Sequence, residues 1–200
     1  MKCVLLLSCL LGLATGCEPQ ATPQQAAPEQ AIAPPAPQPA PRLARQVVIP
    51  EDAVRGDFDG DGTAEYVWLV PPARDSATYD CVGECTSYLT SSNPALKPYA
   101  LESATGGELT TFHHLGAGRR DYLGIAPARL MGCWNSYYVL TYRAGGWQLG
   151  VKPFTTHCDQ WEKDSIAVAR DSAHAGQVLI HYTDMAAGDF AVKTKSVPLR

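Results

Sequence analysis

Residues 57–71 read DFDGDGTAEYVWLVP and combine a candidate metal loop with the start of a β-strand. Carboxylates stand at positions 1, 3, 5 and 9 of the loop, and its sixth residue is glycine. Acids so close together repel one another in any compact conformation, so the pattern favours a hard divalent cation that neutralises them. Calcium takes about 6 to 8 oxygen ligands of this kind. Residues 65–70 are rich in aromatic and β-branched side chains, which predicts that the loop runs directly into a strand.

The loop offers a complete set of candidate calcium ligands. Its aspartates would each give a carboxylate oxygen, its threonine a backbone carbonyl, and its glutamate an oxygen, directly or through water. These ligands are Asp57, Asp59, Asp61, Thr63 and Glu65. A plain turn is the alternative interpretation, because Asp and Gly are the commonest turn residues. However, alternating aspartates followed by a glutamate exceed what a turn requires, so we expect a calcium site.

The spacing of the loop resembles a known family. An EF-hand would place a bidentate glutamate at position 12, where this chain has Trp68. The form Asp-x-Asp-Gly-Asp-Gly-x-x-acid resembles the calcium loops of FG-GAP and integrin-like (VCBS-type) repeats. This resemblance implies a structural metal site that clamps a turn between strands, without catalytic turnover. Residues 132–138 and 156–161 also look like motifs of small bacterial lipoproteins that carry this loop, a similarity that implies no particular activity.

The N-terminus predicts export and a lipid anchor. Lys2 is followed by an apolar stretch at residues 4–14, which is shorter than the roughly 20 residues of a membrane span. Residues 13–17, LATGC, resemble the end of a bacterial lipoprotein signal, so we expect residues 1–16 to be removed and Cys17 to carry lipid. Cys9 is the alternative, but it would leave a very short hydrophobic region. The membrane is therefore a predicted partner, and Glu18 after the lipidated cysteine favours the outer membrane if the source is Gram-negative.

Residues 17–45 predict a tether rather than a fold. Residues 18–41 consist almost wholly of Pro, Ala and Gln and hold half of the chain's 16 prolines. Such a composition cannot form a core and favours extended polyproline geometry. The tether would hold a folded domain, residues 46–200, away from a membrane.

The cysteines predict two disulfides in that domain. The chain has 7 cysteines, and four remain once the N-terminal ones are set aside. Export favours oxidation, and three connectivities are possible. Strands at 135–143 and 147–151 would form a hairpin that brings Cys133 opposite Cys158, which leaves Cys81 to pair with Cys85. A zinc site using Cys133, His157 and Cys158 is an alternative, but the paired spacings usual for structural zinc are absent. A catalytic thiol is disfavoured, because a paired cysteine is not a nucleophile.

Short apolar runs between turn residues predict an all-β, mainly antiparallel domain, either a β-sandwich or a partial propeller. The predicted strands are 66–70, 86–90, 99–101, 122–125, 137–142, 147–151, 166–169, 178–182 and 190–197.

The sequence also contains an internal repeat. Residues 57–71 align without gaps on residues 113–127, and the glycines, the acid, the tyrosine and the proline match. In the second copy His113, Leu115 and Ala117 replace the aspartates, which indicates a loop that kept its fold and lost its ion, although chance similarity is the alternative.

Charge and motifs narrow the function. The net charge is −4 without a basic patch, which disfavours nucleic acid as a partner. Phosphate-binding, dinucleotide-binding, nucleophile-elbow and metalloprotease motifs are absent. Tyr138, Tyr142 and Trp147 form a possible binding surface for a cell-wall glycan or an envelope protein. We therefore expect a non-enzymatic, calcium-binding envelope lipoprotein that acts as a binding or structural module. The alternatives are a carbohydrate- or peptidoglycan-binding domain and a hydrolase that uses the aspartates.

Overall fold

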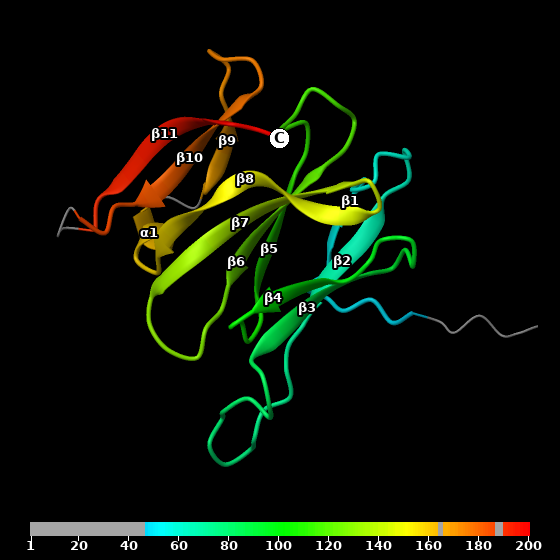
Figure 1. Cartoon of the computed structure of the whole chain (residues 1–200), viewed down its shortest axis with the longest axis vertical. Helices are drawn as coiled ribbons and strands as arrows, with labels where there is room; N and C mark the ends of the chain where they lie inside the picture. Colours follow the sequence, from blue (N-terminus) through cyan, green and yellow to red (C-terminus); the bar gives the residue numbers. More distant parts are fainter. Residues whose placement is uncertain (1–46, 164–165, 187–189) are drawn as a thin grey trace, which may run out of the picture. The chain divides into compact units, whose positions relative to one another are not determined.

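The computed structural model describes residues 47–163, 166–186 and 190–200 (Figure 1). The chain divides into two units, Met1–Ala44 and Arg45–Arg200. The predicted signal peptide, the predicted lipid attachment at Cys17 and the tether up to residue 45 lie outside the described residues. Within the described part, no helix has both the length and the apolar character needed to cross a membrane.

The all-β prediction is confirmed. The described strands form three antiparallel sheets, and the helix found among the described residues is one short segment, α1 (Gln160–Lys163). The first sheet contains β1 (Val54–Gly56), β2 (Glu65–Val70), β3 (Thr86–Ser91) and β4 (Tyr99–Glu102). The second contains β5 (Gly107–Phe112), β6 (Tyr122–Pro127), β7 (Trp134–Arg143) and β8 (Gly146–His157). The third contains β9 (Val168–Arg170), β10 (Gln177–Thr183) and β11 (Val192–Pro198).

The first two sheets have the same design. Their strand orders are β1-β2-β3-β4 and β5-β6-β7-β8, so each is an antiparallel meander in which neighbours in sequence are neighbours in space. The acidic loop joins the first two strands of one meander, and its aligned counterpart joins the first two strands of the other. The two aligned segments therefore occupy equivalent positions in two similar sheets.

The second sheet is the central layer, and its two faces contribute to two cores. On β6, Leu123 and Ile125 pack against the first sheet, whereas Tyr122 and Ala126 pack towards the third. This explains why β6 is nearly continuous in apolar residues, since both faces are buried, while β2 alternates buried and more exposed positions. The packing is that of a layered β-sandwich, and Figure 1 shows the three sheets with the β7–β8 hairpin in the middle one.

The β7–β8 hairpin is the longest pairing in the domain. Its tight turn places Ala144 and Gly145 at φ of 50° and 75°, the left-handed region that a type I′ hairpin requires at both central residues. The ladder extends from Arg143, opposite Gly146, to Trp134, opposite His157. At the open end of the hairpin, opposite the turn, Cys133 precedes β7 and Cys158 follows β8.

Candidate functional site

The acidic loop folds around its own aspartates. One carboxylate oxygen each of Asp57, Asp59 and Asp61 lies within 4.8 Å of the others. The first aspartate anchors the loop, because its two oxygens accept hydrogen bonds from the backbone N–H of Gly60 at 2.8 Å and of Gly62 at 3.1 Å. Both glycines have positive φ, 80° and 94°, a conformation that L side chains rarely adopt. The sequence thus gathers three negative charges in a small volume and fixes the loop that carries them.

The remaining predicted ligands have different surroundings. Thr63 is exposed, and its N–H donates to Asp61 Oδ1 at 2.6 Å. Glu65 begins β2, is only 4 % exposed and lies outside the group of three aspartates. Its Oε2 accepts from the N–H of Phe58 at 3.1 Å, so the glutamate fastens the loop to the strand.

Glu65 is also coupled to the aspartates. The Asn93 side-chain amide lies 3.4 Å from Glu65 Oε1 and 3.4 Å from Asp59 Oδ2, which links the two carboxylates. Burial, followed by the charge of Asp59, raises the pKa of Glu65 above its ordinary value, although the hydrogen bonds act in the opposite direction. A bound cation would favour the ionised form that these surroundings disfavour.

The aligned second loop braces the first. The N–H of Asp57 donates to Asp121 Oδ2 at 2.8 Å, and the N–H of Asp121 donates to the Asp57 carbonyl at 2.8 Å. Arg120 donates from Nε and Nη2 to the carbonyl of Asp59 at 3.1 and 2.7 Å. His113 Nδ1 lies 3.0 Å from Asp121 Oδ2. The second loop therefore offers its own acid and a guanidinium to the backbone of the first. The three aspartate side chains accept from the backbone of their own loop, and Asp59 also accepts from Asn93.

Both predicted disulfide pairs are present. Cys81 and Cys85 are joined with a Cα separation of 5.4 Å, in the connection between β2 and β3. Cys133 and Cys158 are joined with a Cα separation of 5.0 Å, at the open end of the β7–β8 hairpin. The β7–β8 ladder ends at the pair Trp134–His157, and the next residue on each strand is a cysteine. The N–H of Cys158 donates to the carbonyl of Cys133 at 3.2 Å, as the hairpin argument expected.

Of the three aromatic residues predicted to form a binding surface, Tyr142 is buried, and Tyr138 and Trp147 are half-buried. Tyr142 is 7 % exposed and belongs to the core between the first two sheets, and Tyr138 and Trp147 pack against that core. The Tyr142 hydroxyl donates to the carbonyl of Ala95 at 2.7 Å and accepts from the N–H of Lys97 at 3.3 Å. Tyr138 and Tyr142 contribute to the same core, which the residues of the first sheet complete.

A groove that the sequence did not reveal lies between the second and third sheets. It has a volume of about 550 Å³, with a floor that includes Phe154 and Ile180 and an edge that includes Lys152, Lys195 and Arg200. Residues from β8, β10 and β11 form it, so no local pattern could have predicted it. The lysines and prolines of the two edge strands beside it disfavour the addition of another strand.

A histidine, a serine and an aspartate also meet at the turn between β9 and β10. Asp171 Oδ2 lies 2.9 Å from His174 Nδ1 and accepts a hydrogen bond from the Ser196 hydroxyl. The carboxylate therefore stands between hydroxyl and imidazole, whereas a nucleophilic triad needs the imidazole in the middle. The arrangement braces the turn, because Asp171 Oδ1 also accepts from the backbone N–H of Ala173 and His174.

We expect the ionised carboxylate of Asp171 to make a contribution to stability that is lost in acid. The hydrogen bonds from Ser196 and His174 lower the pKa of Asp171 from 3.8 to about 2. Because the folded-state pKa is the lower one, the ionised carboxylate stabilises the fold above about pH 4, and this contribution is lost as pH falls towards 2. We expect Asp171→Asn to melt below the wild type at neutral pH, with a difference that narrows between pH 4 and 2. Thermal unfolding followed by circular dichroism at constant ionic strength measures this, and a difference independent of pH would contradict it.

Comparisons with known proteins add no assignment. No family model matches the chain, and the searches of curated proteins and of solved structures return no significant match. The functional argument therefore rests on the geometry of this chain.

Proposed function

We propose that this protein is a non-enzymatic envelope lipoprotein whose β-domain is braced by a calcium ion in the loop 57–65. In this proposal lipid on Cys17 anchors the chain in a bacterial membrane, and residues 18–45 act as the tether. If the source is Gram-negative, the outer membrane is the expected location. The domain would serve as a structural or binding module whose partner is an envelope protein or a glycan.

The convergence of the three aspartates carries the proposal. Their carboxylate oxygens lie within 4.8 Å of one another at a partly exposed loop, and oxygen donors of this kind suit a hard cation. The contacts of Arg120 do not replace an ion, because its guanidinium binds the carbonyl of Asp59. The clustered aspartate carboxylates therefore remain available to a calcium ion, whose charge would offset theirs.

The position of the loop explains why the ion would be structural. The residue between the first two aspartates, Phe58, is fully buried in the core of the first two sheets. The backbone of Asp57 is joined to Asp121 in the loop before β6. An ion that fixes the aspartates would therefore also fix one core aromatic and the junction between the two meanders.

The alternative functions have less support. A carbohydrate-binding role was predicted from Tyr138, Tyr142 and Trp147, but Tyr142 is buried and Trp147 packs against Phe58 with ring centroids 5.8 Å apart. A hydrolase would need an acid and a base that converge in a cleft. The aspartate oxygens instead accept hydrogen bonds from backbone N–H groups of their own loop and from the side-chain amide of Asn93.

Calcium titration tests the proposal. We expect calcium to release heat on binding and to raise the melting temperature, with a stabilisation of about 2.7 kcal/mol when free calcium is 100 times the dissociation constant. Asp59→Ala should remove both effects, because it deletes a ligand and leaves only two of the three clustered aspartates. Magnesium should be a weaker substitute, since it demands a more rigid octahedral shell.

Asp52→Ala provides the matched control. It removes the same charge from an exposed position just before β1, outside the loop, so it should leave calcium binding intact. Absence of heat and of any thermal shift in the wild type would contradict the calcium site. An equal loss in both variants would point to a general charge effect.

A further inference from the structure

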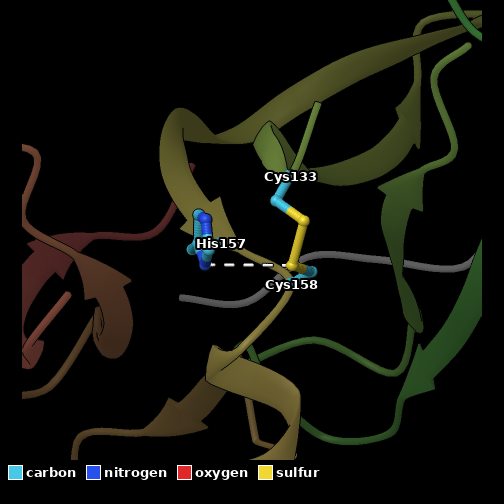
Figure 2. A group of neighbouring side chains, drawn as sticks. All are labelled: Cys133, His157 and Cys158. Atoms are coloured by element: carbon cyan, nitrogen blue, oxygen red, sulfur yellow. Dashed lines mark hydrogen bonds between the residues drawn. A yellow bond between two sulfur atoms is a disulfide. The ribbon is translucent and has the colours of Figure 1, made fainter. Parts of the chain in front are cut away.

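The open end of the β7–β8 hairpin brings together a second set of potential metal donors. These are sulfur and nitrogen atoms, whereas the donors of the acidic loop are oxygens. Cys133 precedes β7, His157 ends β8, and Cys158 follows it. The two sulfur atoms and a ring nitrogen of His157 lie within 4.8 Å of one another, and His157 Nδ1 is 3.9 Å from Cys158 Sγ. Figure 2 shows the imidazole beside the disulfide, with Nδ1 facing the sulfur of Cys158.

Asp159 supplies a fourth donor. Its Oδ1 lies 3.5 Å from Cys158 Sγ, and its Oδ2 lies 3.4 Å from His157 Nδ1. Its backbone N–H donates to His157 Nδ1 at 3.3 Å, so a neutral imidazole carries its lone pair on that nitrogen, and a metal ion would have to displace this hydrogen bond. The same lone pair is what a metal ion binds.

Three of the four donors, Cys133, His157 and Cys158, are held by contacts that do not depend on the bond between the sulfurs. Trp134 pairs with His157 in the ladder, and the N–H of Cys158 donates to the carbonyl of Cys133 at 3.2 Å. The imidazole is only 11 % exposed and packs against Trp134 and Phe190, with ring centroids 4.8 and 4.5 Å away. Reduction of the disulfide would therefore leave two thiols and a fixed imidazole side by side.

We propose that reduction of the Cys133–Cys158 disulfide creates a binding site for a zinc-type divalent ion. A dithiol reductant transfers two electrons and two protons to the disulfide and itself becomes a disulfide, which leaves two thiols. Zinc then displaces both thiol protons and is bound by the thiolates, by Nδ1 of His157 and by the carboxylate of Asp159. Two sulfurs, one nitrogen and one oxygen suit the tetrahedral preference of zinc, whereas the all-oxygen loop 57–65 suits calcium.

The other disulfide of the domain is an internal comparison. Cys81 and Cys85 are also joined at the surface, but among the described residues they belong to no group of three clustered donors. Reduction should therefore give two thiols there without an imidazole. The proposal requires that the two reduced pairs differ in their affinity for a metal ion.

Cobalt(II) is a suitable probe, because thiolate coordination gives intense charge-transfer absorption. The full chain is used with Cys3, Cys9 and Cys17 replaced by serine, reduced with a phosphine that is then removed without air. We expect a saturable thiolate–cobalt band that zinc abolishes, and no band in the oxidised protein. The band should persist when Cys81 and Cys85 are replaced by serine. His157→Ala should weaken binding at least about 10-fold, since even changes to groups that only support a ligand cost about 10- to 100-fold.

Three results would overturn the proposal: no thiolate band in the reduced protein, an unchanged affinity in His157→Ala, or loss of the band when only Cys81 and Cys85 are replaced. Near-ultraviolet circular dichroism establishes that each reduced protein is folded. Replacement of Cys133 and Cys158 by serine should abolish the band. If that variant does not fold, the oxidised protein provides the same test without a substitution.

Discussion

Phe58→Ala is expected to lower the free energy of unfolding by about 3–5 kcal/mol, the usual cost of removing a buried aromatic ring. Phe58 is fully buried although it lies inside the acidic loop, and its ring packs 5.8 Å from that of Trp147. The structure makes room for it at Gly56, where a Cβ atom would lie 2.8 Å from Phe58 Cζ. Because small domains are stable by only about 5–15 kcal/mol, this loss is a large fraction of the total.

Urea unfolding followed by circular dichroism measures this effect. Tyr88→Ala is the matched control, since Tyr88 is a strand aromatic that is 50 % exposed, and its loss should cost about 1 kcal/mol or less. We also expect weaker calcium binding in Phe58→Ala, because the loop loses its attachment to the core. Equal destabilisation by the two variants would show that Phe58 does not hold the loop.

Gly124→Ala is expected to be the second most damaging change, with a loss of about 3 kcal/mol, at the upper end of the cost of overpacking a core. A Cβ at this position of β6 would lie 2.2 Å from Tyr137 Oη and 2.6 Å from Phe112 Cε2. The ring of Tyr137 cannot move away easily, because it is 3 % exposed and hydrogen-bonded to Thr110. Its burial raises the pKa of the hydroxyl to about 12.

A double variant tests the proposed cause. Tyr137→Phe removes the oxygen that the new methyl group would meet first, so Gly124→Ala should cost less in that background than in the wild type. Gly146→Ala is the control, since a Cβ there would meet nothing within 4 Å, and we expect a change within about 0.5 kcal/mol. Thermal and urea unfolding measure the wild type, the two single variants, the double variant and the Gly146→Ala control. Strictly additive losses would contradict a direct clash.

The sequence predicted the strands that carry a strong local signal. All nine predicted strands correspond to strands of the structure. Their ends differ by at most three residues, except that β8 continues to His157, six residues beyond its predicted end. It missed β1 and β5. The first has only three residues, and the second, GELTTF, begins with glycine and is half polar, so it becomes a strand by pairing with β6. The β-propensity of its residues could not predict β5, because the backbone hydrogen bonds that make it a strand come from β6.

The candidate sites divide in the same way. The acidic loop and the hairpin disulfide could be predicted because their residues are close in sequence or paired through a single turn. The aromatic surface could not be judged, because alternation assigns Tyr142 to a face without showing that β1–β4 cover it. The contact of Asp121 with Asp57 and the donors around His157 also depend on tertiary packing. The aligned loops showed which segments are similar, but not that they touch.

The mutual hydrogen bonds of the two loops have a consequence for the order of folding. Asp57 and Asp121 are separated by 64 residues in the sequence. Tyr122, whose hydroxyl donates to the carbonyl of Arg200, is separated from Arg200 by another 78 residues. Contacts this distant in sequence require closure of long loops, which slows folding. During synthesis the acidic loop leaves the ribosome well before its partner exists. Its final geometry, and with it the proposed calcium affinity, is therefore acquired late, once the second meander has been made.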